Sequence, residues 1–135
     1  YRTLCRCGVL DELCWHDERT VRLGAGENLY GIEEIRAFRA ARPAAGLDRQ
    51  LRNTVITTFG EDFAVCSTEF TREGTEKIGR QQQTWVRMTQ GWCVVAVQAS
   101  LMSGGPPWVG PISTGQAPDR AYGAGCVVIQ WSAIC

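Results

Sequence analysis

A change of hydrophobic period about one-third of the way along the chain constrains the fold most. Residues 32–42, IEEIRAFRAAR, place Ile32, Ile35 and Phe38 on one stripe, with acids in the first turn and arginines in the last. A proline follows and ends this predicted helix. Four β-rich runs then occupy residues 53–59, 62–70, 77–88 and 92–102, with short glycine-containing or polar turns between them. A helix followed by an antiparallel meander predicts an α+β fold.

The segment before this helix contributes a helix end and a short extended piece. Residues 9–15, VLDELCW, carry apolar side chains at helical spacing, so they end a helix that begins near or before the first residue. Residues 20–23, TVRL, are expected to be extended, which turns Arg22 to the face opposite Val21 and Leu23. The following ENLYG stretch is predicted to be a loop.

The chain is predicted to hold one domain and an extension of different composition. At 135 residues it is long enough to bury a sizeable core without disulfides or metals. Residues 1–102 form the predicted domain, with a truncated first helix. Residues 103–135 are rich in glycine and proline. The final ten residues, CVVIQWSAIC, are expected either to add a strand or to remain an exposed apolar segment.

Composition excludes several classes of partner and site. Basic and acidic residues number 14 each, and no basic run is interleaved with aromatics, which argues against nucleic acid. No apolar run reaches the roughly 18 residues that cross a bilayer, so we expect a cytoplasmic protein without membrane contact. Seven cysteines include no Cys-x-x-Cys pair, and a single histidine makes a structural zinc site improbable. The cysteines are expected to be small buried apolar groups, and no metal ligand set is predicted.

The last two β-rich runs define a candidate binding surface. If Gln90 and Gly91 form a two-residue turn, Trp85 lies opposite Ala96 and Gln83 opposite Gln98. One face then carries two tryptophans, three glutamines, an arginine and a serine. These are Gln81, Gln83, Trp85, Arg87, Trp92, Gln98 and Ser100. Such a face suits a small polar ligand, although a solvated outer sheet face is the alternative.

Three further residues carry candidate chemistry. His16 in CWHDERT is a potential proton donor or acceptor oriented by Asp17, or a structural group at a helix end. Arg22 either binds a carboxylate bidentately inside a curved sheet or lies at the surface. Tyr30 precedes a helix, where its hydroxyl would contact a ligand or its ring would only pack. Neither a hydrolytic triad nor a phosphate-binding loop is present in the sequence.

Several stretches together resemble the AtzH-like proteins, which include the HpxZ-type oxalurate-catabolism proteins. They are WHDERTVR, ENLYGIEEIRAFRAARPAAGL, TVITT, KIGRQ, QTWVR and SLM, and the resemblance covers about residues 9–102. It implies a cystatin-like, nuclear-transport-factor-2-like (NTF2-like) cone of strongly curved antiparallel sheet wrapped on helices. The cone would have a cavity in its mouth and would form a homodimer.

The resemblance also implies a function. The family is associated with catabolism of small carboxylated ureas and amides, and one branch resembles decarboxylases that use no cofactor. Arg22 would hold a carboxylate, and Tyr1 is the candidate proton donor of the first helix; the family pattern leads us to expect histidine at Gln98. His16, Tyr30, Gln83, Trp85 and Gln98 are the candidate substrate-binding residues. The alternative is a non-catalytic protein that binds a small molecule or assembles with an amidase.

Overall fold

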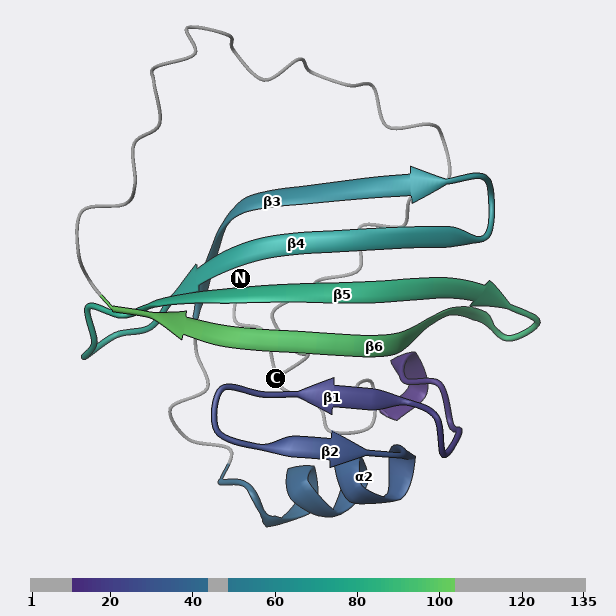
Figure 1. Cartoon of the computed structure of the whole chain (residues 1–135), viewed down its shortest axis with the longest axis horizontal. Helices are drawn as coiled ribbons and strands as arrows, with labels where there is room; N and C mark the ends of the chain where they lie inside the picture. Colours follow the sequence, from purple (N-terminus) through teal and green to yellow (C-terminus); the bar gives the residue numbers. More distant parts are fainter. Residues whose placement is uncertain (1–10, 44–48, 104–135) are drawn as a thin grey trace, which may run out of the picture.

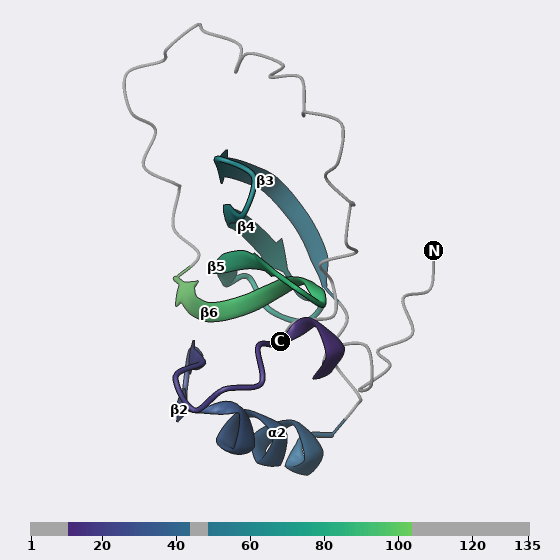
Figure 2. The same ribbon diagram turned by 90° about the vertical axis from the view of Figure 1, so that its right-hand side faces the viewer.

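The computed structural model describes residues 11–43 and 49–103, which form a curved sheet with a helix beside one end (Figures 1 and 2). The named elements are β1 (Val21–Leu23), β2 (Asn28–Tyr30), α2 (Ile32–Ala41), β3 (Gln50–Phe59), β4 (Phe63–Thr71), β5 (Ile78–Met88) and β6 (Gly91–Met102). A helical turn at 11–13 precedes them. The strand order is β2-β1-β6-β5-β4-β3. Neighbouring strands are antiparallel except β1 and β6, which are parallel.

The predicted element types are confirmed with one exception. The helix, the short extended piece and the four-stranded meander lie where the hydrophobic pattern places them. The exception is β2, within a stretch predicted to be a loop, which pairs with β1. Tyr1 and the extension after residue 103 lie outside the described residues, so the predictions that fall on them remain predictions.

The two faces of the sheet have different surroundings. Laterally paired residues project to the same side, so the register places Arg22, Val97, Gln83 and Cys66 on one face. We call this the inner face, because the guanidinium of Arg22 there lies over the ring of Phe38 in α2. The other face is called the outer face. The apolar core lies mainly on the inner face and comprises Ala64, Cys66, Trp85, Val94 and Val97.

Backbone hydrogen bonds fix β1 relative to the start of α2. The amide of Gly31 donates to the carbonyl of Thr20 at 2.7 Å, and the amide of Ile32 donates to the carbonyl of Asp17 at 3.1 Å. Gly31 has a φ of 84°, a left-handed conformation that disfavours residues with a Cβ. This glycine therefore lets the chain leave β2 and enter the helix directly.

The predicted register of the last hairpin is wrong. Met88 pairs with Gly91, so the turn lies one residue earlier than expected, and Trp85 pairs with Val94. A register shift follows, after which Thr84 pairs with Ala96. The extra residue of this bulge lies in β6, between Val94 and Ala96. It turns every later side chain of β6 to the other face.

Gln98 is the functional candidate that this register error misplaced. It pairs with Gln82 on the outer face, whereas Gln83 and Trp85 lie on the inner face. Gln98 therefore does not share one surface with Gln83 and Trp85. Trp85 is 2% exposed, so the alternative of a solvated face is also wrong for this residue.

No helix in residues 11–43 and 49–103 is long and apolar enough to cross a membrane. The three cysteines of these ranges, Cys14, Cys66 and Cys93, are buried and free, as predicted. The same ranges contain no group of three or more His, Cys, Asp and Glu side chains arranged to hold a metal ion.

Candidate functional site

Arg22 is a buried cation on the inner face. It is 5% exposed, its Nη1 forms an ion pair with Glu27 Oε1, and its Cζ lies 5.2 Å from the centre of the Phe38 ring. The ring supports one face of the guanidinium, and Glu27 holds its edge. The guanidinium is thus held in a fixed orientation, with Glu27 as its carboxylate partner.

The glycine-containing loop between β1 and β2 brings Glu27 to Arg22. The amide of Gly24 donates to the carbonyl of Glu27 at 2.8 Å, which closes a tight turn. A Cβ on Gly24 would meet the Glu27 carboxylate at less than 3.0 Å, closer than real Cβ contacts. Glycine at this position therefore leaves space for the Arg22–Glu27 pair.

Two buried glutamines continue the polar part of the inner face along β5. Gln83 is 3% exposed and Gln81 is 4% exposed. The indole Nε1 of Trp85 donates to Gln83 Oε1 at 3.1 Å, and Arg49 Nη1 donates to Gln81 Oε1 at 3.3 Å. The first bond fixes the orientation of the Gln83 amide, so its Nε2 is the donor side of that group.

Cys66 lies opposite Gln83 in the register. Burial raises the pKa of the Cys66 thiol to about 11. At neutral pH the group is therefore a protonated thiol and a poor nucleophile. The inner face consequently offers a cation and amides for binding, and this thiol does not supply covalent catalysis.

His16 belongs to a different cluster, at the end of the helical turn. Arg36 Nη2 lies 3.2 Å from His16 Nδ1, and arginine can only donate, so Nδ1 accepts and Nε2 carries the proton. Nε2 then donates to the carbonyl of Asp11 at 2.7 Å. These contacts match the structural alternative predicted for His16, and Arg19 rather than His16 engages the predicted orienting residue, Asp17.

The Asp11–Arg36 pair predicts an acid-sensitive contribution to stability. Arg36 donates from Nε and Nη2 to the two carboxylate oxygens at 2.7 and 2.8 Å. These hydrogen bonds hold the pKa of Asp11 below its usual 3.8. Its stabilisation is thus complete above pH 3.8 and is lost as pH falls through the lowered pKa. We expect Asp11→Asn to cost about 1 kcal/mol at pH 7, because the pair is partly solvated.

Thermal unfolding of wild type and Asp11→Asn between pH 7 and pH 2.5 checks this prediction. The difference in Tm should shrink as the wild-type carboxyl becomes protonated. Glu33→Gln is the matched control, because Glu33 is 84% exposed and contacts the same arginine at 3.4 Å. A pH-independent difference for Asp11→Asn would contradict the assignment.

The remaining candidates do not join Arg22. Tyr30 pairs with Val21, which places its side chain on the outer face, and it is 60% exposed. Tyr30 and Arg22 therefore lie on opposite faces of the sheet. Exposed Gln98 also lies on the outer face, and Tyr1 is outside the described residues. Among the predicted site residues within 11–43 and 49–103, only Gln83 and Trp85 share the inner face with Arg22.

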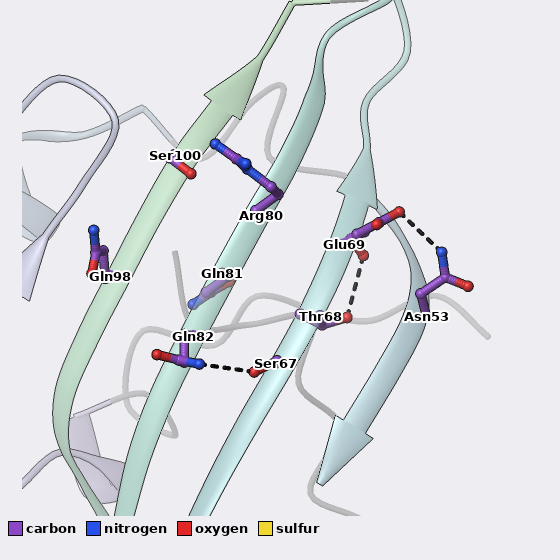
Figure 3. A pocket seen from close by; sticks show the side chains of 9 residues that line it. All are labelled: Asn53, Ser67, Thr68, Glu69, Arg80, Gln81, Gln82, Gln98 and Ser100. Carbon is purple, nitrogen blue, oxygen red and sulfur yellow. Dashed lines mark hydrogen bonds between the residues drawn. The ribbon is translucent and has the colours of Figure 1, made fainter. Parts of the chain in front are cut away.

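The outer face carries a shallow polar groove of about 360 Å³. Its lining residues come from β3 to β6 and are Asn53, Ser67, Glu69, Arg80, Gln82, Gln98 and Ser100, together with Thr68 and Gln81, whose side chains are buried (Figure 3). Within it, Gln82 Nε2 donates to Ser67 Oγ at 3.1 Å, and Asn53 Nδ2 donates to Glu69 Oε2 at 3.0 Å. Gln98 thus belongs to an open surface across the sheet from Arg22.

Sequence reasoning missed Glu27 as the partner of Arg22. The signal was present, because RLGAGEN places an acid five residues after an inward-facing arginine across a glycine-containing loop. Phe38 was assigned only to the apolar stripe of the helix. Its second role as a platform for Arg22 depends on how α2 crosses the end of the sheet, which the sequence pattern does not specify.

The helix-then-meander topology and the strongly curved sheet define a cystatin-like, NTF2-like α+β fold. The AtzH-like family model matches residues 4–105. The chain therefore belongs to the AtzH-like family, as the resemblance of its sequence predicted.

Solved structures agree with this assignment. A Pectobacterium atrosepticum protein of the DUF3225 family, of unknown function, is 76% identical, with a TM-score of 0.70 over 71% of this chain and 75% of the other. A Burkholderia xenovorans cystatin-like fold protein is 45% identical, with a TM-score of 0.68 over 71% and 76%. An NTF2-like superfamily protein of Salmonella enterica, 19% identical, shares the fold with a TM-score of 0.56 over 86% and 84%. No curated protein matches the chain.

Proposed function

We propose that this protein is an enzyme without metal or organic cofactor that decarboxylates a small N-carboxylated urea or amide. The observation that carries the proposal is the buried Arg22 on the inner face, oriented by Glu27 and Phe38. Membership of the AtzH-like family adds support, because the resemblance implies this class of substrate.

Arg22 acts in this proposal as the binding group for a carboxylate. The substrate replaces Glu27 at the guanidinium, since both present the same planar pair of oxygens. Gln83 lies on the same face, with its amide oriented by Trp85, and its Nε2 suits a urea carbonyl oxygen. The two groups together distinguish a carboxylated urea from a simple carboxylic acid.

The reaction itself breaks one bond and moves one proton. The bond between nitrogen and the departing carboxylate carbon breaks, its electron pair remains on nitrogen, and carbon dioxide leaves. The nitrogen then takes a proton, for which Tyr1 remains the sequence-based candidate. A pocket that excludes water from the departing carboxylate favours the neutral product over the anion.

A turnover assay tests this function. Carbon dioxide released from an N-carboxylated urea is measured above the uncatalysed rate for wild type, Arg22→Gln and Arg80→Gln. We expect wild-type turnover and a loss of about 100-fold in kcat/KM for Arg22→Gln, as for removal of a charged hydrogen-bond donor. Arg80 is exposed and lies in the outer groove, so Arg80→Gln should match wild type.

The outcome also separates the alternative function. Wild type that binds small dicarboxylates without releasing carbon dioxide would contradict the enzyme and leave a non-catalytic binding or assembly partner of an amidase. The Arg22–Glu27 pair favours the assembly role within this alternative, because that role does not require a carboxylate to displace Glu27.

We further propose that the outer face contacts a second copy of this chain. Val55 and Phe59 are 58% and 60% exposed, and the Phe59 ring lies 5.9 Å from that of Phe63. Arg52 and Glu69 form an ion pair at 3.0 Å on the neighbouring strands β3 and β4, close to Val55. A two-fold axis through such a patch brings apolar groups together and sets each acid against a base.

The homodimer predicts a change of mass on mutation of this patch. Light scattering after size exclusion should give twice the chain mass of 14.9 kDa for wild type and one chain mass for Phe59→Glu. Leu101→Glu is the control, because Leu101 is 48% exposed and pairs with Gly79, outside this patch. Equal masses for wild type and Phe59→Glu would contradict the proposal.

A further inference from the structure

Two arginines face each other at the β3–β4 end of the inner face. Arg49 immediately precedes β3, and Arg72 immediately follows β4. Gln50 pairs with Thr71, so Arg49 and Arg72 form the next cross-strand position. Phe70 is a buried inner-face residue, and Arg72, two residues later, projects to the same side.

The Phe70 ring is a platform for both guanidiniums. The Cζ atoms of Arg49 and Arg72 lie 4.6 and 5.5 Å from its centre. The ring is 4% exposed and occupies the space where Gly79 has no side chain. Because the ring is held, the two cations are held with it.

The two guanidinium groups concentrate positive charge at this end of the sheet. Within the described residues, no ion pair balances the charge of Arg72. The Nε of Arg72 is buried and has no hydrogen-bond partner within residues 11–43 and 49–103. Like charges directly across a strand pair destabilise a sheet, and a buried donor without an acceptor costs further free energy. An anion between the two arginines would offset both costs.

We propose that Arg49, Arg72 and Phe70 form a second anion-binding site that takes the carboxylate of a small organic acid. Guanidinium groups match the planar pair of carboxylate oxygens. The bond from Arg49 to Gln81 fixes one side of the site. None of these residues contacts Arg22 in the hydrogen bonds, ion pairs and ring contacts of the described residues, so the site does not depend on the proposed decarboxylation.

Arginine side-chain NMR on the full chain tests the site directly. Acetate is the probe, titrated against chloride at constant ionic strength while the Nε–Hε signals of Arg49 and Arg72 are followed. We expect both signals to shift and saturate with one midpoint. Arg72→Gln should raise the acetate midpoint of the Arg49 signal roughly tenfold, the value of one charged hydrogen bond.

Two further variants keep the test decisive. Arg80→Gln removes an exposed arginine of the outer groove and should leave the midpoint unchanged. If Arg72→Gln fails to fold, Arg72→Lys keeps the charge without the planar fork and should raise the midpoint several-fold. A linear, unsaturated drift of the Arg49 signal would overturn the site. An unchanged midpoint in the folded Arg72 variant would overturn it equally, whatever the turnover assay gives.

Discussion

Replacing Arg22 by glutamine is expected to lower the free energy of unfolding by about 3 kcal/mol at pH 7. Glu27, whose side chain is 25% exposed, loses its counter-ion, and the cation–ring contact with Phe38 is lost as well. Water cannot fully replace the guanidinium at a position that is 5% exposed. Urea denaturation of wild type and variant measures the loss.

The double variant Arg22→Gln/Glu27→Gln identifies the cause. It should be at least about 1 kcal/mol more stable than Arg22→Gln alone, because no uncompensated carboxylate remains. Arg80→Gln, an exposed arginine, should stay within about 0.5 kcal/mol of wild type. The single variant Glu27→Gln completes the comparison. If the loss in the double variant equals the sum of the losses in Arg22→Gln and Glu27→Gln, Arg22 and Glu27 stabilise the fold independently.

Gly79→Ala is expected to lower the free energy of unfolding by about 2 kcal/mol, the second-largest loss after Arg22→Gln. A Cβ at this position would lie less than 3.0 Å from the Phe70 ring, closer than real Cβ contacts. Phe70 is buried and supports two arginines, so the ring has little freedom to move away. Thermal unfolding should show a drop in Tm of roughly 8 °C.

Two matched variants show whether steric overlap is responsible. Gly26 has nothing within 4 Å of an added Cβ, so Gly26→Ala should leave Tm nearly unchanged. Phe70→Leu should reduce the additional cost of Gly79→Ala, because the overlapping ring atoms are gone. Equal losses for Gly79→Ala and Gly26→Ala would refute the predicted packing of Phe70.

The element types were predictable because each has a local cause. The stripe of Ile32, Ile35 and Phe38 has the period of a helix, and the later runs are rich in β-formers with turn residues between them. The strand β2 escaped prediction because three residues are too few to show a period. Its pairing depends on the contact with β1 rather than on its own sequence.

The register and the site were less predictable because they depend on distant pairing. One bulge beside Trp85 separates Gln98 from Gln83, and no turn motif marks it. The inward direction of Arg22 followed from strand alternation, and the structure confirms it as a buried side chain. Tyr30 was a candidate because it precedes the helix and because of the family resemblance, yet strand pairing places its side chain on the outer face.

A crystal structure of the protein with bound malonate tests the central claim most directly. The claim is that Arg22 receives a substrate carboxylate in exchange for Glu27. We expect a malonate carboxylate within hydrogen-bonding distance of the Arg22 guanidinium and the Glu27 side chain turned away from it. Malonate bound only elsewhere, with the Arg22–Glu27 ion pair intact, would contradict the claim.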